Sequence, residues 1–217
     1  MTIVINGSGT VTGISVGGLP DNTVDNGTMA DDAIGVAELS ATGTASSSTF
    51  LRGDNAWAAP GGIANACQFR VTSNWNPSDS WTDITANWEV NDTAGYSTLG
   101  SAVTESSGIF SFPSTGFWYI TFGGMADYNG SAVNWASLEL QATINNSSYT
   151  ALTLATAGIA DGGSNTYTQL NGDAILDVTD TSNVKCKLRT ETDADTTWHG
   201  ATANNQTWIT FIRLADT

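Results

Sequence analysis

The clearest alternation of apolar and polar positions in the chain lies in residues 108–122. Large apolar side chains recur at every second position of its two halves: Phe110, Phe112, Trp118, Ile120 and Phe122. This two-residue period is typical of a β-strand that buries one face. Pro113 cannot donate to a strand ladder and Gly116 supplies the backbone freedom of a turn, so we expect two strands joined by a tight turn.

The second of these strands is apolar on both faces, because Phe117 and Tyr119 alternate with the first set. One inner face cannot hold this many large aromatic side chains. We therefore expect one set to fill the core of a sandwich and the other set to be buried by neighbouring subunits. The residues predicted to lie in the core or in a trimer contact are Phe110, Phe112, Phe117, Trp118, Tyr119, Phe122 and Trp208.

From residue 63 onward, short strand-like segments follow one another at regular intervals. We place them near 66–73, 80–90, 95–104, 107–113, 116–127, 133–145, 149–157, 165–171, 173–180, 183–190 and 206–215. Turn-forming pairs separate them, among which Asn171 and Gly172 predict a turn between two of the later strands. Many short strands at this spacing are typical of a β-sandwich or barrel. The sequence therefore predicts an all-β head domain over 63–217.

Residues 1–62 have a different character from the head. Their first part alternates weakly and is interrupted by glycines, so a strand formed there cannot bury enough apolar surface to stand alone. Residues 28–39 begin with the capping residue Thr28 and have roughly helical apolar spacing, which predicts a short helix. Such a helix is marginal in isolation and becomes plausible as one strand of a parallel bundle on a symmetry axis.

The segment 40–62 resembles a flexible linker, since serine, threonine and glycine dominate it. Phe50, Leu51 and Trp57 are too apolar for a free linker, so we expect them to pack on copies of themselves. The boundary between the stalk and the head is placed at Gly62. The sequence thus predicts an extended, low-complexity N-terminal stalk, residues 1–62, that folds only within an oligomer.

Charge and composition exclude several classes of function. The formal net charge is −15, from 21 acidic and 6 basic residues, and such a surface repels nucleic-acid phosphates and anionic membranes. No segment approaches the ~20 apolar residues of a membrane-spanning helix. The N-terminus lacks a basic region and an apolar run, so we expect synthesis in a cytosol. Cys67 and Cys186 are then expected to be buried thiols and not a disulfide framework.

The spacing of residues 108–119 is similar to a known family motif. Gly, Phe, Pro, Gly and two aromatics stand in the order and at the intervals of that motif: Gly108, Phe110, Pro113, Gly116, Trp118 and Tyr119. It resembles the globular head of complement's first component, in the tumour-necrosis-factor-like superfamily. Weaker matches follow at 170–175, which resembles a turn of those heads, and at 208–214, which resembles their closing strand.

This resemblance implies an antiparallel, ten-stranded jelly roll that assembles as a tight homotrimer. The collagen-like stalk of the complement family is absent, because 1–62 has no Gly-x-y repeat, and no immune function is expected. Residues 13–20 and 42–57 instead resemble segments of tail-fibre and other appendage proteins of tailed bacteriophages. That second resemblance implies a virion protein, made in the host cytoplasm, which contacts other virion proteins through residues 1–62.

Catalysis is not expected from these residues. His199 is the only histidine, no serine has the surroundings of a nucleophile elbow, and the acids are scattered over turns. Glu191, Asp193 and Asp195 alternate and could face one way to hold Ca²⁺, although a solvated acidic rim is favoured. No other cofactor is predicted.

Two further features are candidates for binding. Lysine and arginine alternate with apolar residues over 184–189, which indicates either a basic strip for an acidic partner or, as we prefer, cross-strand pairs on a solvent-facing edge strand. Trp75 and Trp198 are expected to be exposed aromatics at a receptor site, together with His199.

The preferred hypothesis is a non-enzymatic, trimeric fibre protein of a bacteriophage virion. Its head would bind a host-surface receptor, most simply a glycan, and threefold repetition would raise the avidity of weak sites. One alternative is a capsid decoration or assembly protein whose head is a trimerisation unit without receptor binding. A second alternative is a polysaccharide-degrading enzyme, which would need a specific pair of carboxylates.

Overall fold

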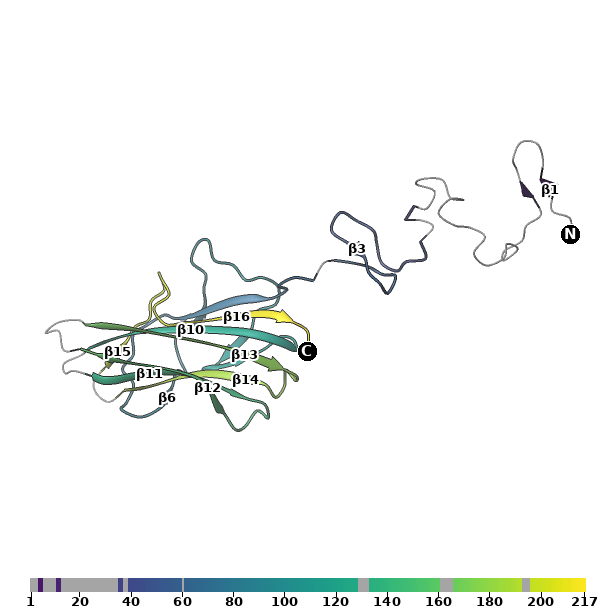
Figure 1. Ribbon diagram of the computed structural model, residues 1–217. Helices are drawn as coiled ribbons and strands as arrows, with labels where there is room; N and C mark the ends of the chain where they lie inside the picture. The colour runs from purple at the N-terminus through teal and green to yellow at the C-terminus, as the bar shows by residue number, and fades with distance from the viewer. Residues whose placement is uncertain are drawn as a thin grey trace. The chain divides into compact units, whose positions relative to one another are not determined.

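The computed structural model comprises two compact units, residues 1–61 and residues 62–217. It describes residues 4–5, 11–12, 35–36, 39–59, 61–128, 133–160, 166–192 and 196–217. The regular secondary structure in these ranges consists of β-strands (Figure 1). The short helix predicted over 28–39 lies almost wholly outside the described residues. Where the structure is described, no helix is long and apolar enough to cross a membrane.

The N-terminal unit contains two small strand pairs. β1 (Val4–Ile5) pairs with β2 (Val11–Thr12), and β3 (Phe50–Leu51) pairs with β4 (Trp57–Ala58), each in antiparallel order. Asn55 takes a left-handed conformation in the β3–β4 turn, with φ of 60°. Phe50 and Leu51 remain 47% and 38% exposed in the single chain, as expected for residues that lack a core of their own.

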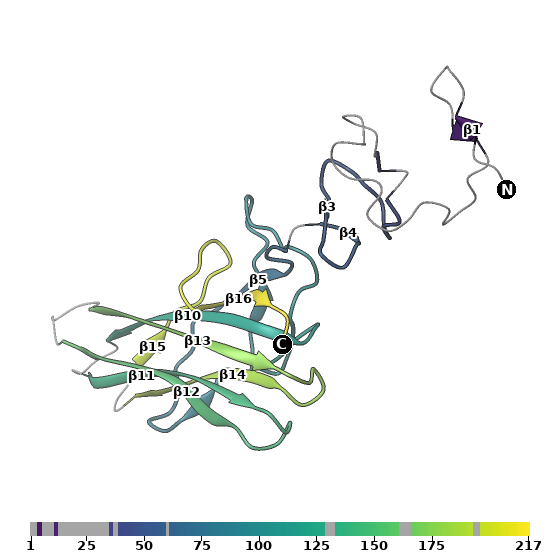
Figure 2. The same cartoon turned by 45° about the vertical axis from the view of Figure 1, so that its right-hand side comes forward.

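The head is a sandwich of two antiparallel sheets, which Figures 1 and 2 show in two orientations. The β10 sheet has the order β13 (Tyr167–Val178), β10 (Gly116–Tyr128), β16 (Trp208–Ala215), β5 (Ala66–Val71) and β7 (Trp88–Val90), with β15 (Thr196–Trp198) beside the end of β10. The β11 sheet has the order β12 (Thr150–Ile159), β11 (Val133–Thr143), β14 (Lys185–Thr192), β9 (Ile109–Ser111) and β8 (Thr104–Ser106), with β6 (Thr82–Asp83) beside β14. This is the predicted jelly-roll architecture.

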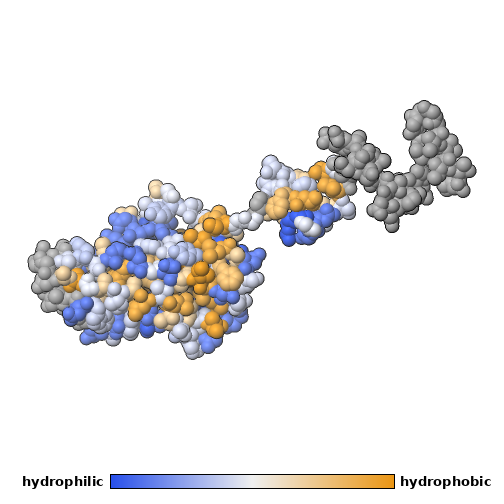
Figure 3. Space-filling model, viewed as in Figure 1, coloured by the Kyte–Doolittle hydropathy of each residue, from blue (hydrophilic) through white to orange (hydrophobic). Residues whose placement is uncertain are grey.

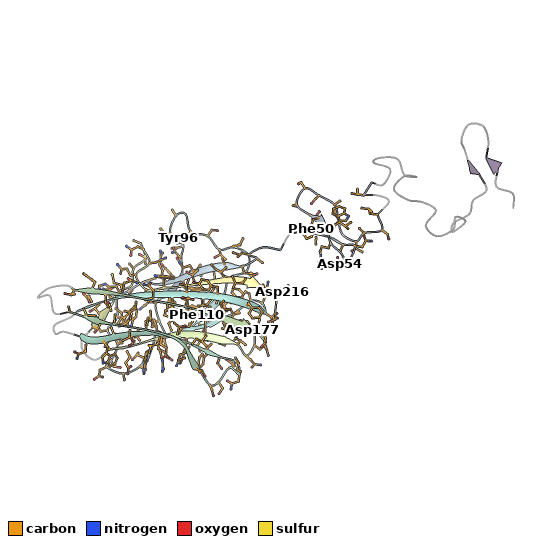
Figure 4. The ribbon with its side chains drawn as sticks, in the orientation of Figure 1. Phe50, Asp54, Tyr96, Phe110, Asp177 and Asp216 are labelled. Atoms are coloured by element: carbon orange, nitrogen blue, oxygen red, sulfur yellow. The ribbon has the colours of Figure 1, made fainter. Side chains whose placement is uncertain are left out.

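Aromatic rings join the two sheets. Phe110 projects from β9 between the sheets (Figure 4), and its ring centroid lies 5.2 Å from those of Phe69, Phe211 and Trp88. Phe112 continues the cluster towards Trp118, at 5.2 Å. The apolar side chains of 108–122 that were expected in the core are buried there, namely Phe110, Phe112, Trp118, Ile120 and Phe122. The core face predicted for this segment is therefore confirmed.

The predicted turn at Asn171 and Gly172 is wrong. β13 runs through both residues without interruption and pairs with β10 along its whole length. Gly172 serves packing instead, since a Cβ at this position would lie 2.5 Å from the ring of Phe122. The segment 95–104 also differs from the expectation, because it is a loop until β8 begins at Thr104.

A buried arginine fixes the outer face of the sheet at β5. Arg70 is only 1% exposed, and its Nε donates to Glu89 at 2.6 Å while Nη2 donates to Asp92 at 2.7 Å. Nη1 donates to Asn91 and Thr93. The charge is thus paired and its donors are satisfied, as a buried guanidinium requires. Residues 89–93 thereby form a polar cover over this part of the β10 sheet.

The two cysteines are buried and unpaired, as predicted. Burial raises the pKa of the Cys186 thiol. Burial also raises the pKa of Cys67, against a smaller lowering effect from the backbone N–H of Val103, which donates to Sγ at 3.4 Å. A raised pKa leaves little of the reactive thiolate at neutral pH.

We expect a disulfide-forming thiol reagent at neutral pH to modify neither Cys67 nor Cys186 in the native protein, because both are inaccessible and protonated. Both should react once guanidinium unfolds the chain. The released chromophore measures the number of modified thiols, and Cys186→Val reports the contribution of Cys67. Rapid reaction of either thiol under native conditions would contradict their burial.

Candidate functional site

Trp75 and Trp198, far apart in the sequence, form a stacked pair at one end of the sandwich. Their ring centroids lie 5.9 Å apart with an interplanar angle of 23°. Reciprocal backbone hydrogen bonds of 3.0 and 2.9 Å join the two residues in an antiparallel bridge. The structure therefore brings together the two tryptophans predicted for a receptor site, with His199 directly after the second.

The prediction that Trp198 is exposed is wrong, because its side chain is completely buried. β15 pairs with the end of β10 and sets Trp198 opposite Ala126, on the core side of the sheet. Gly124 makes room for the ring, since a Cβ there would lie 2.7 Å from it. Trp75 is half-buried and keeps a solvent-facing part. Of the two tryptophans, only Trp75 can contact a ligand.

A cavity of about 220 Å³ opens beside Trp75. Its apolar floor includes the buried side chains of Val71 and Ile84, and Trp75 contributes an aromatic wall. Polar and small residues complete the lining: Thr82, Asp83, Thr85, Ala86 and Asn87. An aromatic wall with convergent polar groups is typical of a small-molecule site.

His199 lies against an acid and an aromatic ring. Its Nε2 is 3.3 Å from Oδ1 of Asp127, and its ring centroid is 5.5 Å from that of Tyr167. The side chains of His199 and Asp127 are only 14% and 13% exposed. His199 also accepts a hydrogen bond on its backbone oxygen from Thr207. Nε2 of His199 and Oδ1 of Asp127 are nevertheless buried without a hydrogen-bond partner among the described residues, and the low exposure of His199 leaves little of it for a receptor.

Two of the three basic residues of β14 are paired with acids within the head, whereas Lys185 donates to the backbone oxygen of Thr181. Lys187 donates to Asp83 at 2.7 Å, and Arg189 donates to Glu139 at 2.7 Å from the neighbouring β11. The guanidinium of Arg189 also lies over the ring of Trp81, at 4.3 Å. The preferred interpretation of cross-strand pairs is confirmed for Lys187 and Arg189. β14 is nevertheless an interior strand of its sheet, so the expected edge position is wrong.

The acidic triad predicted as a calcium candidate can be followed only in part. Glu191 is half-buried near the end of β14, whereas Asp193 and Asp195 lie outside the described residues. Within the described ranges, no group of three or more histidine, cysteine or acidic residues could hold a metal ion.

The outer face of the β10 sheet carries an apolar surface. Tyr119 stands between Ile175 of β13 and Ile212 of β16 in the strand register, and Phe117 follows two residues away on the same face. Ile175 is 64% exposed and Phe117 is 39% exposed. We call these four residues the outer apolar surface. On the head in Figure 3, apolar residues gather towards the end where these strands and the C-terminus lie.

Three residues predicted for the core or for a trimer contact do not lie in the core. Phe117 and Tyr119 point outward, and Trp208 lies half-buried on the same outer face, over Gly123. The core is therefore excluded for these three side chains. Their burial by another subunit stays a prediction.

Comparisons with known proteins support the fold. No protein-family model and no curated protein matches the sequence. Among solved structures, murine APRIL at pH 5.0 matches with a TM-score of 0.51 and 8% identity, over 69% of this chain and 98% of that chain. Eiger TNF from S. frugiperda matches with a TM-score of 0.50 and 16% identity, over 70% of this chain and 93% of that chain. At these identities the likeness shows the fold alone, which is a tumour-necrosis-factor-like jelly roll.

Substitution should separate the roles of the paired tryptophans. We expect Trp198→Ala to lower the free energy of unfolding by about 3–5 kcal/mol, because it empties a fully buried site. Trp75→Ala should cost clearly less, because Trp75 is half-buried. Urea denaturation at one fixed protein concentration measures both values. An equal or larger loss for Trp75→Ala would contradict the assignment of Trp198 as the core member of the pair.

Proposed function

We propose that this chain is the subunit of a homotrimeric, non-enzymatic virion appendage of a tailed bacteriophage, with a jelly-roll head that binds a host-surface receptor. Three lines support the proposal: the fold of the head, the apolar character of its outer surface, and the resemblance of residues 13–20 and 42–57 to phage fibre segments. The sequence resemblance to complement and tumour-necrosis-factor-like heads is what implies a trimer.

The outer apolar surface is the single structural observation on which the proposal of an oligomer rests. Ile175, Tyr119 and Ile212 form a row across the edge strand β13 and the two strands next to it, on an exposed sheet face where a monomer carries polar residues. Covering an apolar row of this kind with another chain removes it from water and so stabilises the assembly. Copies of the same chain are the partner that the proposal requires, since closed homo-oligomers are the commonest assemblies of soluble proteins.

The other end of the same sheet behaves differently. There Arg70 and the segment 89–93 provide a satisfied polar cover within one chain. The absence of an equivalent cover over Phe117 and Ile175 among the described residues favours a cover supplied by another subunit. The exposed Phe50 and Leu51 of the N-terminal unit support the same conclusion, because three copies could bury them against one another.

Receptor binding is supported by the cavity beside Trp75, which repetition in a trimer would present three times. A capsid decoration or assembly protein would need the trimer but not the cavity. The two functions thus share the oligomeric state and differ in whether the head has a ligand. Labelling of purified particles with an antibody against the head, viewed by electron microscopy, would place the protein on tail or capsid.

We expect light scattering of the purified full chain at micromolar concentration to give three times the 22.6 kDa of one chain. Ile175→Glu should shift the mass towards one chain, because it places a charge in the middle of a desolvated contact. The circular dichroism of a folded β protein should be retained, since Ile175 makes no core contact that folding needs.

Tyr96→Glu is the matched control, because Tyr96 is 52% exposed in a loop away from this surface (Figure 4). It should leave the trimer intact. A wild-type chain that scatters as a monomer would overturn the proposed assembly, and an Ile175→Glu trimer as stable as the wild type would show that another surface holds it.

A further inference from the structure

We propose that the cavity beside Trp75 binds one neutral sugar ring, held between the indole and the polar side chains of residues 82–87. This inference rests on the proposed receptor-binding function and adds the place and the chemical class of the ligand. The cavity lies wholly within one head, because Val71, Trp75 and residues 82–87 line it. One chain therefore suffices to form the site.

The aromatic wall is rigid before any ligand arrives. Trp75 is stacked on the fully buried Trp198 and tied to it by two backbone hydrogen bonds. The ring therefore loses little freedom on binding, and a preorganised aromatic surface is what makes tryptophan effective in binding hot spots. The C–H face of a pyranose presents an apolar patch to such a ring, while its hydroxyls stay available to the polar side.

The segment opposite Trp75 is also held in place by the protein. Thr72 donates twice to the backbone oxygen of Asn87, and Nε1 of Trp88 donates to the backbone oxygen of Ile84 at 2.8 Å. Asn87 takes a left-handed conformation, with φ of 63°. These bonds fix the path of residues 84–88, so the side chains that line the cavity start from a defined backbone.

Polar capacity remains at the mouth of the cavity. Oδ2 of Asp83 accepts from Lys187, and Asp83 keeps its other carboxylate oxygen for a further donor. The side chains of Thr85 and Asn87 are exposed and make no hydrogen bond within the described residues. A carboxylate, an amide and a hydroxyl together donate and accept, which matches the mixed donor and acceptor character of sugar hydroxyls.

Size and charge narrow the ligand further. The volume of about 220 Å³ is below the range of roughly 300–1,000 Å³ that holds drug-sized ligands, so one ring fits better than an extended chain. The net charge of −15 repels anionic ligands, and Lys187 neutralises the Asp83 carboxylate at the rim, so the site itself offers no excess charge. A neutral hexose unit at the end of a glycan satisfies both constraints.

Saturation-transfer NMR on the full chain tests the inference with four defined probes: the methyl α-glycosides of glucose, galactose and mannose, and N-acetylglucosamine. We expect saturation transfer to at least one of them, with a millimolar Kd. Ala86→Arg should weaken binding by about tenfold or more, because Ala86 is exposed at the lining and a long side chain there occupies the space of the ligand.

Trp75→Phe is the second variant and should weaken binding less, since it keeps an aromatic wall of smaller area. Tyr96→Ala removes an exposed aromatic outside the cavity and should bind as the wild type does. Circular dichroism and thermal unfolding establish that each variant is folded. Absence of transfer to all four probes, or binding that Ala86→Arg leaves unchanged, would overturn the inference.

Light scattering on the same samples distinguishes a failure of the sugar site from a failure of the proposed trimer. A trimer that binds none of the probes would remove the sugar site and leave the trimeric head standing. A monomer that binds a probe, and loses that binding in Ala86→Arg, would confirm the sugar site and overturn the proposed trimer, because the cavity needs only one chain.

Discussion

Contact between aromatic rings across the two sheets is the interaction on which the head depends. Phe110 comes from a strand of three residues, yet its ring meets Phe69 and Phe211 of the opposite sheet and Trp88 of the strand beside Phe69. Each such aromatic pair contributes about 0.5–1.5 kcal/mol beyond the area it buries. Aliphatic side chains of both sheets, such as Leu138 and Ile209, fill the rest of the same core, and together with these rings they set the spacing of the layers. Every outward surface of the head is positioned by that spacing.

β10 shows how one strand serves two purposes. Trp118, Ile120 and Phe122 face the core, and the residues between them face outward because side chains alternate along a strand. The outward set includes Phe117 and Tyr119, which are apolar although this chain is strongly acidic elsewhere. Even here the apolar residues have acidic neighbours, because Asp173 and Asp177 flank Ile175 on the same face of β13. An assembly through this face would therefore have to pair or hydrate these carboxylates as well as bury the apolar side chains.

Much of the fold could be read from local periodicity, and much of the site could not. The burial of Phe110 and Trp118 follows from alternation, which acts between neighbouring residues. Trp198 was misplaced because its burial depends on Gly124, a residue of another strand whose missing side chain leaves the space. Gly172 predicted a turn from sequence, but its role in the structure is to leave space for the ring of Phe122 on the neighbouring strand. The cavity is lined from one stretch, residues 71–87, but its shape depends on the hydrogen bond between Thr72 and Asn87, which no sequence spacing signals.

The course of β5 decides how a force applied to the chain would pass through the head. The strand begins at Ala66, four residues after the linker glycine Gly62, and ends at Val71, which lines the cavity. Tension between the linker and a ligand in the cavity would therefore run along the strand. The covalent backbone of β5 would carry this tension directly, so the hydrogen bonds between β5 and β16, which lie across this direction, would bear little of it. The head would therefore resist a force applied through the linker at the start of β5.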